Sequence, residues 1–222
     1  MDSIRRKAAP NKLEDSLTNY IYIQNKFDLD ALYEDHPEYR SVIGSKGMDK
    51  RFRNNIFEKI SAFTEKPINN DDIKVIGLIK NKRVWRYIKR KYVDLTSENL
   101  FRYKVLIPRS NGSGALGEVL STPLIGYTQT FIGFGAFESK SEAEGAFKYI
   151  KSKFARAMLG ILKITQDNNR ATWAEVPMQD FTKNSDIDWS RSIPEIDQQL
   201  YKKYDLSPDE INFIETKVQA MR

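Results

Sequence analysis

Residues 73–91 of this chain read IKVIGLIKNKRVWRYIKRK, and this stretch decides how the rest is interpreted. Its two ends, IKVIGLI (73–79) and VWRYI (84–88), are rich in β-branched and aromatic residues, which favour strands. A third run of this kind, YKVLIP, follows at 103–108. The pattern predicts a β-sheet in the middle of the chain.

The same stretch carries a strongly basic run. Residues 80–91 contain seven basic residues and no acidic one. A solvated face normally mixes charges of both signs, because like charges repel at short range. Cations of one sign interleaved with aromatic side chains are typical of a surface that binds a polyanion. The alternative is an ordinary solvated segment of a basic protein.

The charge is also unevenly distributed over the whole chain. The net charge of the 222 residues is +6. Residues 1–71 have no net charge, residues 72–182 carry +8, and residues 183–222 carry −2. We therefore expect an N-terminal connecting or helical region at 1–71, a basic core that binds nucleic acid at 72–182 and a C-terminal helical tail at 183–222, or a single domain that includes all three.

Composition excludes several classes of site. The chain has no cysteine, so it has no disulfide, thiolate zinc site or cysteine nucleophile. Its one histidine, His36, precedes Pro37 and is interpreted as a turn residue. No stretch reaches the roughly 18–20 apolar residues of a membrane span. We expect a cytoplasmic protein without a membrane partner.

Several helices are predicted from caps and periodicity. The sequence Ser141-Glu-Ala-Glu144 resembles a capping box and predicts a long amphipathic helix at about 141–164. Boxes beginning at Ser192 and Ser207 predict two helices near the C-terminus. Residues 48–63 predict a short helix, and 124–137 and 172–178 predict further strands. The expected fold is α+β: a twisted, mostly antiparallel sheet packed on the long helix, with additional helices at both ends.

A glycine-rich loop at 109–117, RSNGSGALG, lies between two predicted strands. It lacks the Gly-Lys-Ser/Thr ending of a phosphate-binding P-loop. Its Arg and Asn side chains could read base edges, since Arg suits guanine and Asn suits adenine. An ordinary loop is an equally good interpretation.

Two weaker motifs suggest enzymes. The sequence FIGFG (131–135) matches a glycine pattern of methyltransferases that bind S-adenosylmethionine, but a basic segment lies where the ribose-binding acid is expected, so a strand bend is preferred. Glu138-Ser-Lys140 matches half of a Mg²⁺-dependent nuclease site, which Asp94 or Glu118 could complete.

Long segments of the chain resemble a known arrangement. IKVIGLIKNKRVWRYIKRKY (73–92), the stretch 103–137, EAEGAFKYIKSKFARAMLGILKITQDN (142–168) and the stretch 176–204 look like the C-terminal target recognition region of type II restriction–modification proteins. Residues 27–59 are similar to the stretch that joins an adenine methyltransferase to that region. The resemblance covers about residues 26–220, and no position matches the catalytic motifs of the family.

The resemblance implies sequence-specific binding of double-stranded DNA for a methyltransferase or endonuclease domain or subunit that carries S-adenosylmethionine and Mg²⁺. This chain is then expected to need no cofactor and to carry no catalytic or metal-binding residue. Two alternatives stay open: a Mg²⁺-dependent endonuclease using Glu138 and Lys140, and a protein-interaction module that docks on a methyltransferase. The residues expected to contact DNA are Lys80, Lys82, Arg83, Arg86, Lys89, Arg90, Lys91, Lys104, Arg109, Asn111, Ser113, Tyr127, Gln129 and Arg156.

Overall fold

The computed structural model describes residues 1–45, 47–110, 116, 120–122, 125–163 and 167–221. Its strands are β1 (Ile21–Tyr22), β2 (Ile73–Ile79), β3 (Lys82–Ile88), β4 (Tyr103–Pro108), β5 (Leu120–Thr122), β6 (Gly126–Tyr127) and β7 (Phe131–Phe137). They form two sheets, ordered β1-β7-β4-β5 and β3-β2-β6. Every pairing among these strands is antiparallel except that of β2 with β6.

Helices surround both sheets, so the fold is α+β as predicted. The α-helices are α1 (Asp2–Ala8), α2 (Leu29–Asp35), α3 (Arg40–Ile43), α4 (Ile56–Lys59), α5 (Lys140–Lys151), α6 (Lys153–Leu162), α7 (Ile193–Lys203) and α8 (Pro208–Lys217). Short 3₁₀ helices are η1 (Leu13–Asp15), η2 (Leu17–Tyr20), η3 (Pro37–Tyr39), η4 (Gly47–Lys50), η5 (Arg90–Tyr92) and η6 (Arg170–Trp173). No helix in the described part of the chain is both long and apolar enough to cross a membrane.

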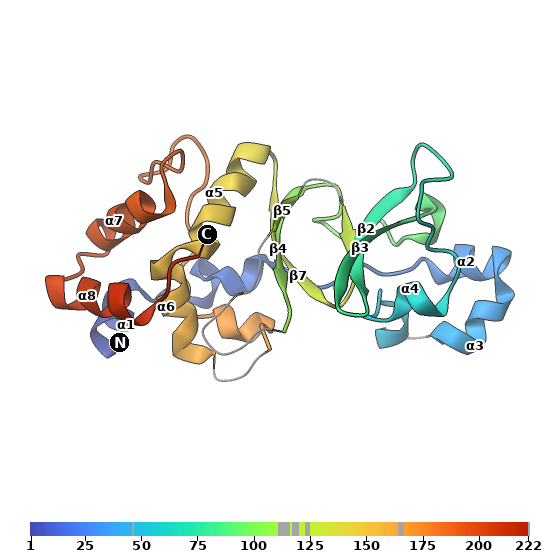
Figure 1. Cartoon of the computed structure of the whole chain (residues 1–222), viewed down its shortest axis with the longest axis horizontal. Helices are drawn as coiled ribbons and strands as arrows, with labels where there is room; N and C mark the ends of the chain where they lie inside the picture. Colours follow the sequence, from blue (N-terminus) through green and yellow to red (C-terminus); the bar gives the residue numbers. More distant parts are fainter. Residues whose placement is uncertain (46, 111–115, 117–119, 123–124, 164–166, 222) are drawn as a thin grey trace.

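Apolar side chains gather in two main clusters. One cluster takes its members from residues 27–100 and packs α2, α3 and α4 against β2 and β3; we call this part the hairpin body. The other packs α5, α6, α7 and α8, with α1, against β4 and β7; we call it the terminal body. The two bodies lie end to end, and both chain ends lie in the terminal body (Figure 1).

A small third cluster joins the bodies. It contains Ile76 of β2, Leu106 of β4 and Phe131 of β7. Ile125 and Tyr127, from the segment between β5 and β7, complete it. The chain changes sheets in this segment: β6 pairs with β2, and β7 pairs with β4. We expected one sheet, in which 124–137 forms either two short strands or one bent strand broken at Gly126 or Gly133. This segment does form two strands, β6 and β7. The structure has two sheets because the chain turns at residues 128–130, where the Phe131 amide donates to the Thr128 carbonyl (3.1 Å).

The predicted long helix is two helices. It begins at Lys140, and its N-cap is Ser139 rather than Ser141, because the Ser139 hydroxyl accepts from the Glu142 amide (3.2 Å). The helix ends at Lys151, where extended Ser152 starts α6 by accepting from the Ala155 amide (3.1 Å). A new N-cap at Ser152 divides the apolar periodic pattern between two helices, and all of residues 154–159 in α6 are buried.

The strand predicted at 172–178 is absent from the described sheets. Residues 170–173 form η6, whose N-cap Asn169 accepts from the Thr172 amide (3.2 Å). Pro177 forms only an isolated bridge with Ser16. The flanking residues make the two hydrogen bonds of this bridge: the Leu17 amide donates to the Val176 carbonyl (2.9 Å), and the Met178 amide donates to the Asp15 carbonyl (2.8 Å). Pro177 has no amide hydrogen to pair with a further strand on its other side.

The two C-terminal helices are confirmed, and both begin at the serines that predicted them. Ser192 and Ser207 each donate their backbone amide to the glutamate three residues later, at 3.0 and 2.7 Å. The helix predicted at 48–63 is reduced to η4 and α4. The division of the chain at residues 71 and 182 stays a prediction.

Candidate functional site

The hairpin formed by β2 and β3 projects the centre of the basic run. Ile79 pairs with Lys82, so Lys80 and Asn81 form a two-residue turn. Both have positive φ values (48° and 61°), as a type I′ hairpin turn requires. Lys80, Asn81 and Lys82 are exposed at this tip.

Alternation along the hairpin gives its two faces different environments. One face carries Val75 and Ile88 into the core of the hairpin body. The other face turns toward the terminal body, and there the Arg83 guanidinium lies 5.7 Å from the centre of the Phe131 ring. On the same face, Lys74 Nζ lies 4.4 Å from the centre of the half-exposed Trp85 ring. Such cation–ring contacts help to fix the position of the charged group.

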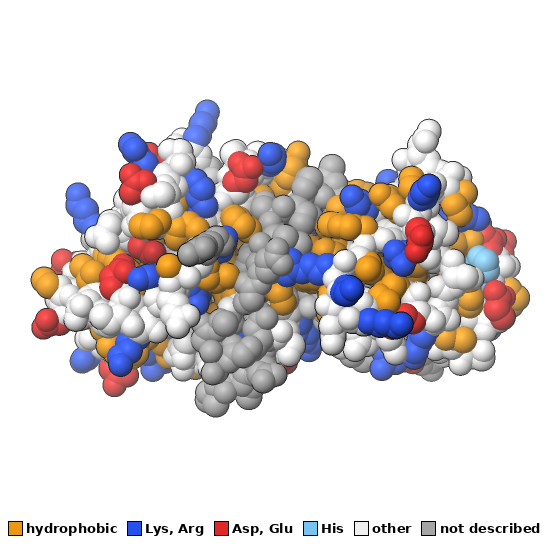
Figure 2. Space-filling model, in the orientation of Figure 1, with side chains coloured by type: hydrophobic (Ala, Val, Ile, Leu, Met, Phe, Trp, Pro, Cys, Tyr) orange, Lys and Arg blue, Asp and Glu red, His pale blue; other side chains and the backbone are white. Residues whose placement is uncertain are grey.

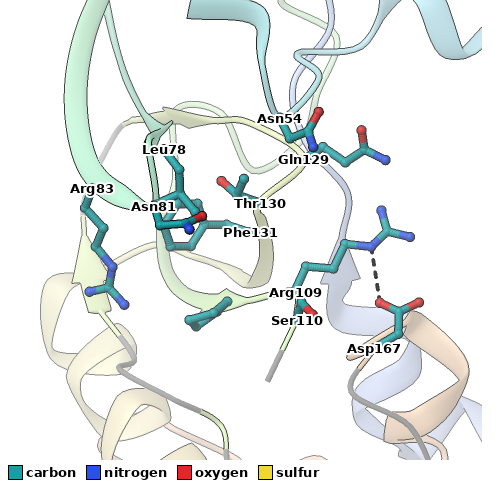
Figure 3. Close-up of a pocket in the computed structure, with 11 residues that line it drawn as sticks. Asn54, Leu78, Asn81, Arg83, Arg109, Ser110, Gln129, Thr130, Phe131 and Asp167 are labelled. Atoms are coloured by element: carbon teal, nitrogen blue, oxygen red, sulfur yellow. Dashed lines mark hydrogen bonds and ion pairs between the residues drawn. The ribbon is translucent and has the colours of Figure 1, made fainter. Parts of the chain in front are cut away.

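An open cleft of about 610 Å³ lies between this face and the end of β4 (Figure 3). Two guanidinium groups, several amides and hydroxyls, and one carboxylate border it, above an apolar base. Such a lining offers many hydrogen-bond donors and acceptors and a net positive charge. The residues are Asn54, Leu78, Asn81, Arg83, Pro108, Arg109, Ser110, Gln129, Thr130, Phe131 and Asp167.

Three predicted residues meet in this cleft although they are far apart in the sequence. Arg83 comes from β3, Arg109 follows β4, and Gln129 lies in the turn between β6 and β7. The backbone of Gln129 is held in place because its main-chain N–H donates to the Phe52 carbonyl (2.7 Å). Figure 2 shows Lys and Arg side chains at the middle of the molecule, where the two bodies adjoin. The fold therefore gathers cations and amides at one junction.

The far end of the basic run lies in a different environment. Arg86 forms an ion pair with Glu65 (3.2 Å), and Lys91 forms one with Asp35 (2.6 Å). Hydrogen bonds from Lys91 and Tyr92 hold the pKa of Asp35 below its usual value. Tertiary contacts thus partly neutralise residues 86–91, although the run at 80–91 itself contains no acid.

Aromatic rings accompany the other two basic residues at this end. The Arg90 guanidinium lies 4.7 Å from the centre of the Phe101 ring. Lys89 Nζ lies 5.6 Å from the centre of the Tyr92 ring. The seven basic residues therefore form two groups at opposite ends of β3. Lys80, Lys82 and Arg83 lie at the tip, and Arg83 of this group lines the cleft; Arg86, Lys89, Arg90 and Lys91 lie at the far end and do not line it.

Three other predicted DNA contacts are buried. Lys104 is fully buried, its ammonium donates to the Leu100 and Arg102 carbonyls (3.4 and 3.0 Å), and burial lowers its pKa to about 7. Tyr127 is also fully buried, and its hydroxyl accepts from the Asn99 amide group (3.1 Å). Arg156 is 8% exposed and faces the C-terminal segment. These three side chains are therefore not part of the DNA-binding region that we propose below.

Asn111 and Ser113 lie outside the described residues. The cleft also contains polar residues that the sequence analysis did not select: Asn54, Asn81 and Asp167. Asn81 had a local signal, since asparagine tolerates the left-handed backbone of a two-residue hairpin turn. Asn54 and Asp167 had none, because only the packing of the two bodies brings them to the cleft.

The described residues of the alternative nuclease site each contact a different partner rather than one another. Glu138 forms an ion pair with Arg102, and Lys140 forms one with Glu144 (3.2 Å). Asp94 accepts from the hydroxyl of Thr96 (2.6 Å), and Glu118 is outside the described residues. In the described part of the chain, no three His, Asp or Glu side chains are grouped as metal ligands.

The glycines of FIGFG serve packing in an antiparallel sheet. A Cβ at Gly133 would lie 2.5 Å from the Tyr127 hydroxyl, and one at Gly135, whose φ is +81°, would clash with the Phe137 ring. Close approach of side chains and a left-handed backbone account for both glycines.

Comparison with known proteins gives no match for this chain: no family model, no curated protein and no solved structure is similar to it.

Proposed function

We propose that this chain binds double-stranded DNA in a sequence-specific manner, through the cleft between its two bodies and the tip of the β2–β3 hairpin. The observation that carries the proposal is the meeting of the guanidinium groups of Arg83 and Arg109 with amide side chains in one open cleft, next to the exposed hairpin tip with Lys80 and Lys82. Cations supply affinity for phosphates, whereas guanidinium and amide groups can read base edges.

The shape of the hairpin suits a groove of DNA. A two-stranded ribbon fits the major groove, which is about 12 Å wide. With the tip entering the groove, Lys80 and Lys82 would reach the phosphates that flank it. Arg83, Arg109 and Gln129 would then face base edges from the cleft. In this arrangement the far end of β3, with its ion pairs, contributes less to DNA affinity.

The biological role we propose follows the resemblance described above. The chain would act as the target recognition region of a type II restriction–modification enzyme and direct methylation or cleavage carried out by a partner domain or subunit. S-adenosylmethionine and Mg²⁺ would bind to that partner. The proposal assigns no catalytic residue to this chain.

The test is the binding of a fluorescent duplex at several salt concentrations, measured by anisotropy. We expect affinity to fall steeply with salt, because each phosphate contact contributes about −0.9 to the slope of log affinity against log salt. Binding to a methyltransferase without salt-dependent binding to DNA would favour the protein-interaction alternative and contradict the proposal.

A second arm adds Mg²⁺ and S-adenosylmethionine to unlabelled plasmid. We expect it to stay uncut and unmethylated. Cleavage that is lost in Glu138→Ala would instead support the nuclease alternative.

A further inference from the structure

The backbone around Arg109 is held from two sides. The Arg109 amide donates to the Thr130 carbonyl (2.9 Å), and the Arg109 carbonyl accepts from the Asn168 amide (2.7 Å). The Asn168 side chain also donates to the Pro108 carbonyl (2.8 Å), and Ser110 forms a bridge with Asp167. The segment that carries Arg109 is thus attached both to the β6–β7 turn and to residues 167–168.

The side chain of Arg109 is oriented as well. Its Nε lies 3.3 Å from Oδ1 of Asp167, and the two side chains are 34% and 44% exposed. In Figure 3 the ion pair ends on Nε, and the two terminal nitrogens point away from Asp167. A guanidinium held in this way presents its terminal N–H groups as a fork with a fixed direction.

Resting on the proposed function, we propose that Arg109 reads a guanine of the target site and that Asp167 is the residue that positions it. An arginine fork bonds to O6 and N7 of guanine in the major groove, a pair that no other base offers. Fixing the side chain before binding removes part of the entropy cost of ordering it. Asp167 is the one carboxylate among the described residues that line the cleft.

Because Asp167 is negatively charged, the direction in which its removal changes DNA affinity and sequence preference tests the proposal. A carboxylate close to DNA repels phosphates, so it weakens binding to every sequence alike. If Asp167 had no positioning role, its removal would strengthen binding to cognate and scrambled duplexes equally. If it positions Arg109, its removal strengthens binding to scrambled duplex but weakens the preference for the cognate site.

The experiment begins with selection of duplexes from a randomised library by the wild-type chain, followed by the same selection with Asp167→Asn and Arg109→Lys. We expect one G·C position of the wild-type consensus to lose its preference in both variants. In anisotropy at fixed salt, the ratio of cognate to scrambled affinity should fall about tenfold. The matched control is Glu65→Gln, which removes one acidic charge beside Arg86 of the hairpin and should leave the ratio unchanged.

The outcomes separate the two proposals. Failure of the wild-type chain to select any sequence would overturn the proposed function, and this inference with it. A wild-type consensus that persists at every G·C position in both variants would overturn the inference alone. Circular dichroism checks that each variant is folded, and Arg109→Lys keeps the positive charge, so its loss of preference would not reflect a change of charge.

Discussion

The Arg83 guanidinium of the hairpin body lies 5.7 Å from the centre of the Phe131 ring, which belongs to β7 of the terminal body. This contact places a cation of the β3 strand beside the cleft that also contains Arg109 and Gln129. Phe131 is itself part of the small cluster that joins the two bodies. The position of the cationic tip is therefore tied to the core of the molecule.

The hairpin tip should dominate the dependence of DNA binding on salt. Replacing Lys80 and Lys82 together by alanine removes up to two phosphate contacts and should flatten the slope by about 2 units at most. The matched control replaces Lys89 and Arg90, which lie at the other end of β3 and do not line the cleft, and should flatten it less. The slopes are measured by anisotropy at five salt concentrations. Equal slopes for both variants would contradict the prediction that the tip makes the main phosphate contacts.

Lys104 should affect stability rather than DNA binding. Its pKa is about 7 in the folded protein and 10.5 ordinarily, so between these pH values the unfolded chain binds more protons. The free energy of unfolding should therefore rise with pH from about 7 to 10.5. Lys104→Met should remove this rise in urea titrations and leave the salt slope of DNA binding unchanged. A smaller slope in Lys104→Met would show that the ammonium reaches DNA.

Asp197 should destabilise the fold as it ionises. Its carboxylate accepts from the Lys153 and Phe154 amides (3.1 and 2.9 Å) at the start of α6, yet burial raises its pKa from 3.8 to about 6. Between these pH values the folded state binds the extra proton, so this group's contribution to stability is lost as pH rises through 6. Asp197→Asn should lack this loss.

Urea titrations of wild type and Asp197→Asn at pH 4.5 and pH 7 give the measurement. Other carboxylates have lowered pKa values and change stability in the opposite direction, among them Glu210, whose pKa falls to about 2. The difference between the two proteins isolates Asp197, because these groups are present in both. A difference that is the same at both pH values would contradict the prediction.

Gly135 should tolerate no side chain. In Gly135→Ala the new Cβ would clash with the Phe137 ring on a backbone with φ of +81°, so we expect a loss of about 1–3 kcal/mol in the free energy of unfolding. Gly160→Ala is the control, because its Cβ has no neighbour within 4 Å and lies in the exposed part of α6. It should stabilise the chain by up to about 1 kcal/mol. Thermal and urea unfolding of both variants check the pair.

Sequence alone determined the elements whose causes are local. The strand runs at 73–79 and 103–108 became β2 and β4, since β-branched and aromatic side chains fit a pleated sheet. The serines at 192 and 207 marked α7 and α8, because a capping box involves residues only three positions apart. The basic run and its concentration in the middle of the chain are likewise properties of the sequence.

Tertiary structure decided what those elements contact. The helical pattern continues through Ser152, so the division of the helix depends on Ser152 adopting a cap and on Asp197 of α7 accepting from the amides that follow. Glu65 and Asp35 neutralise part of a run that is purely basic in sequence. Asp167 likewise reaches Arg109 only through the fold. Burial and ion pairing depend on distances in space, which local sequence patterns do not determine.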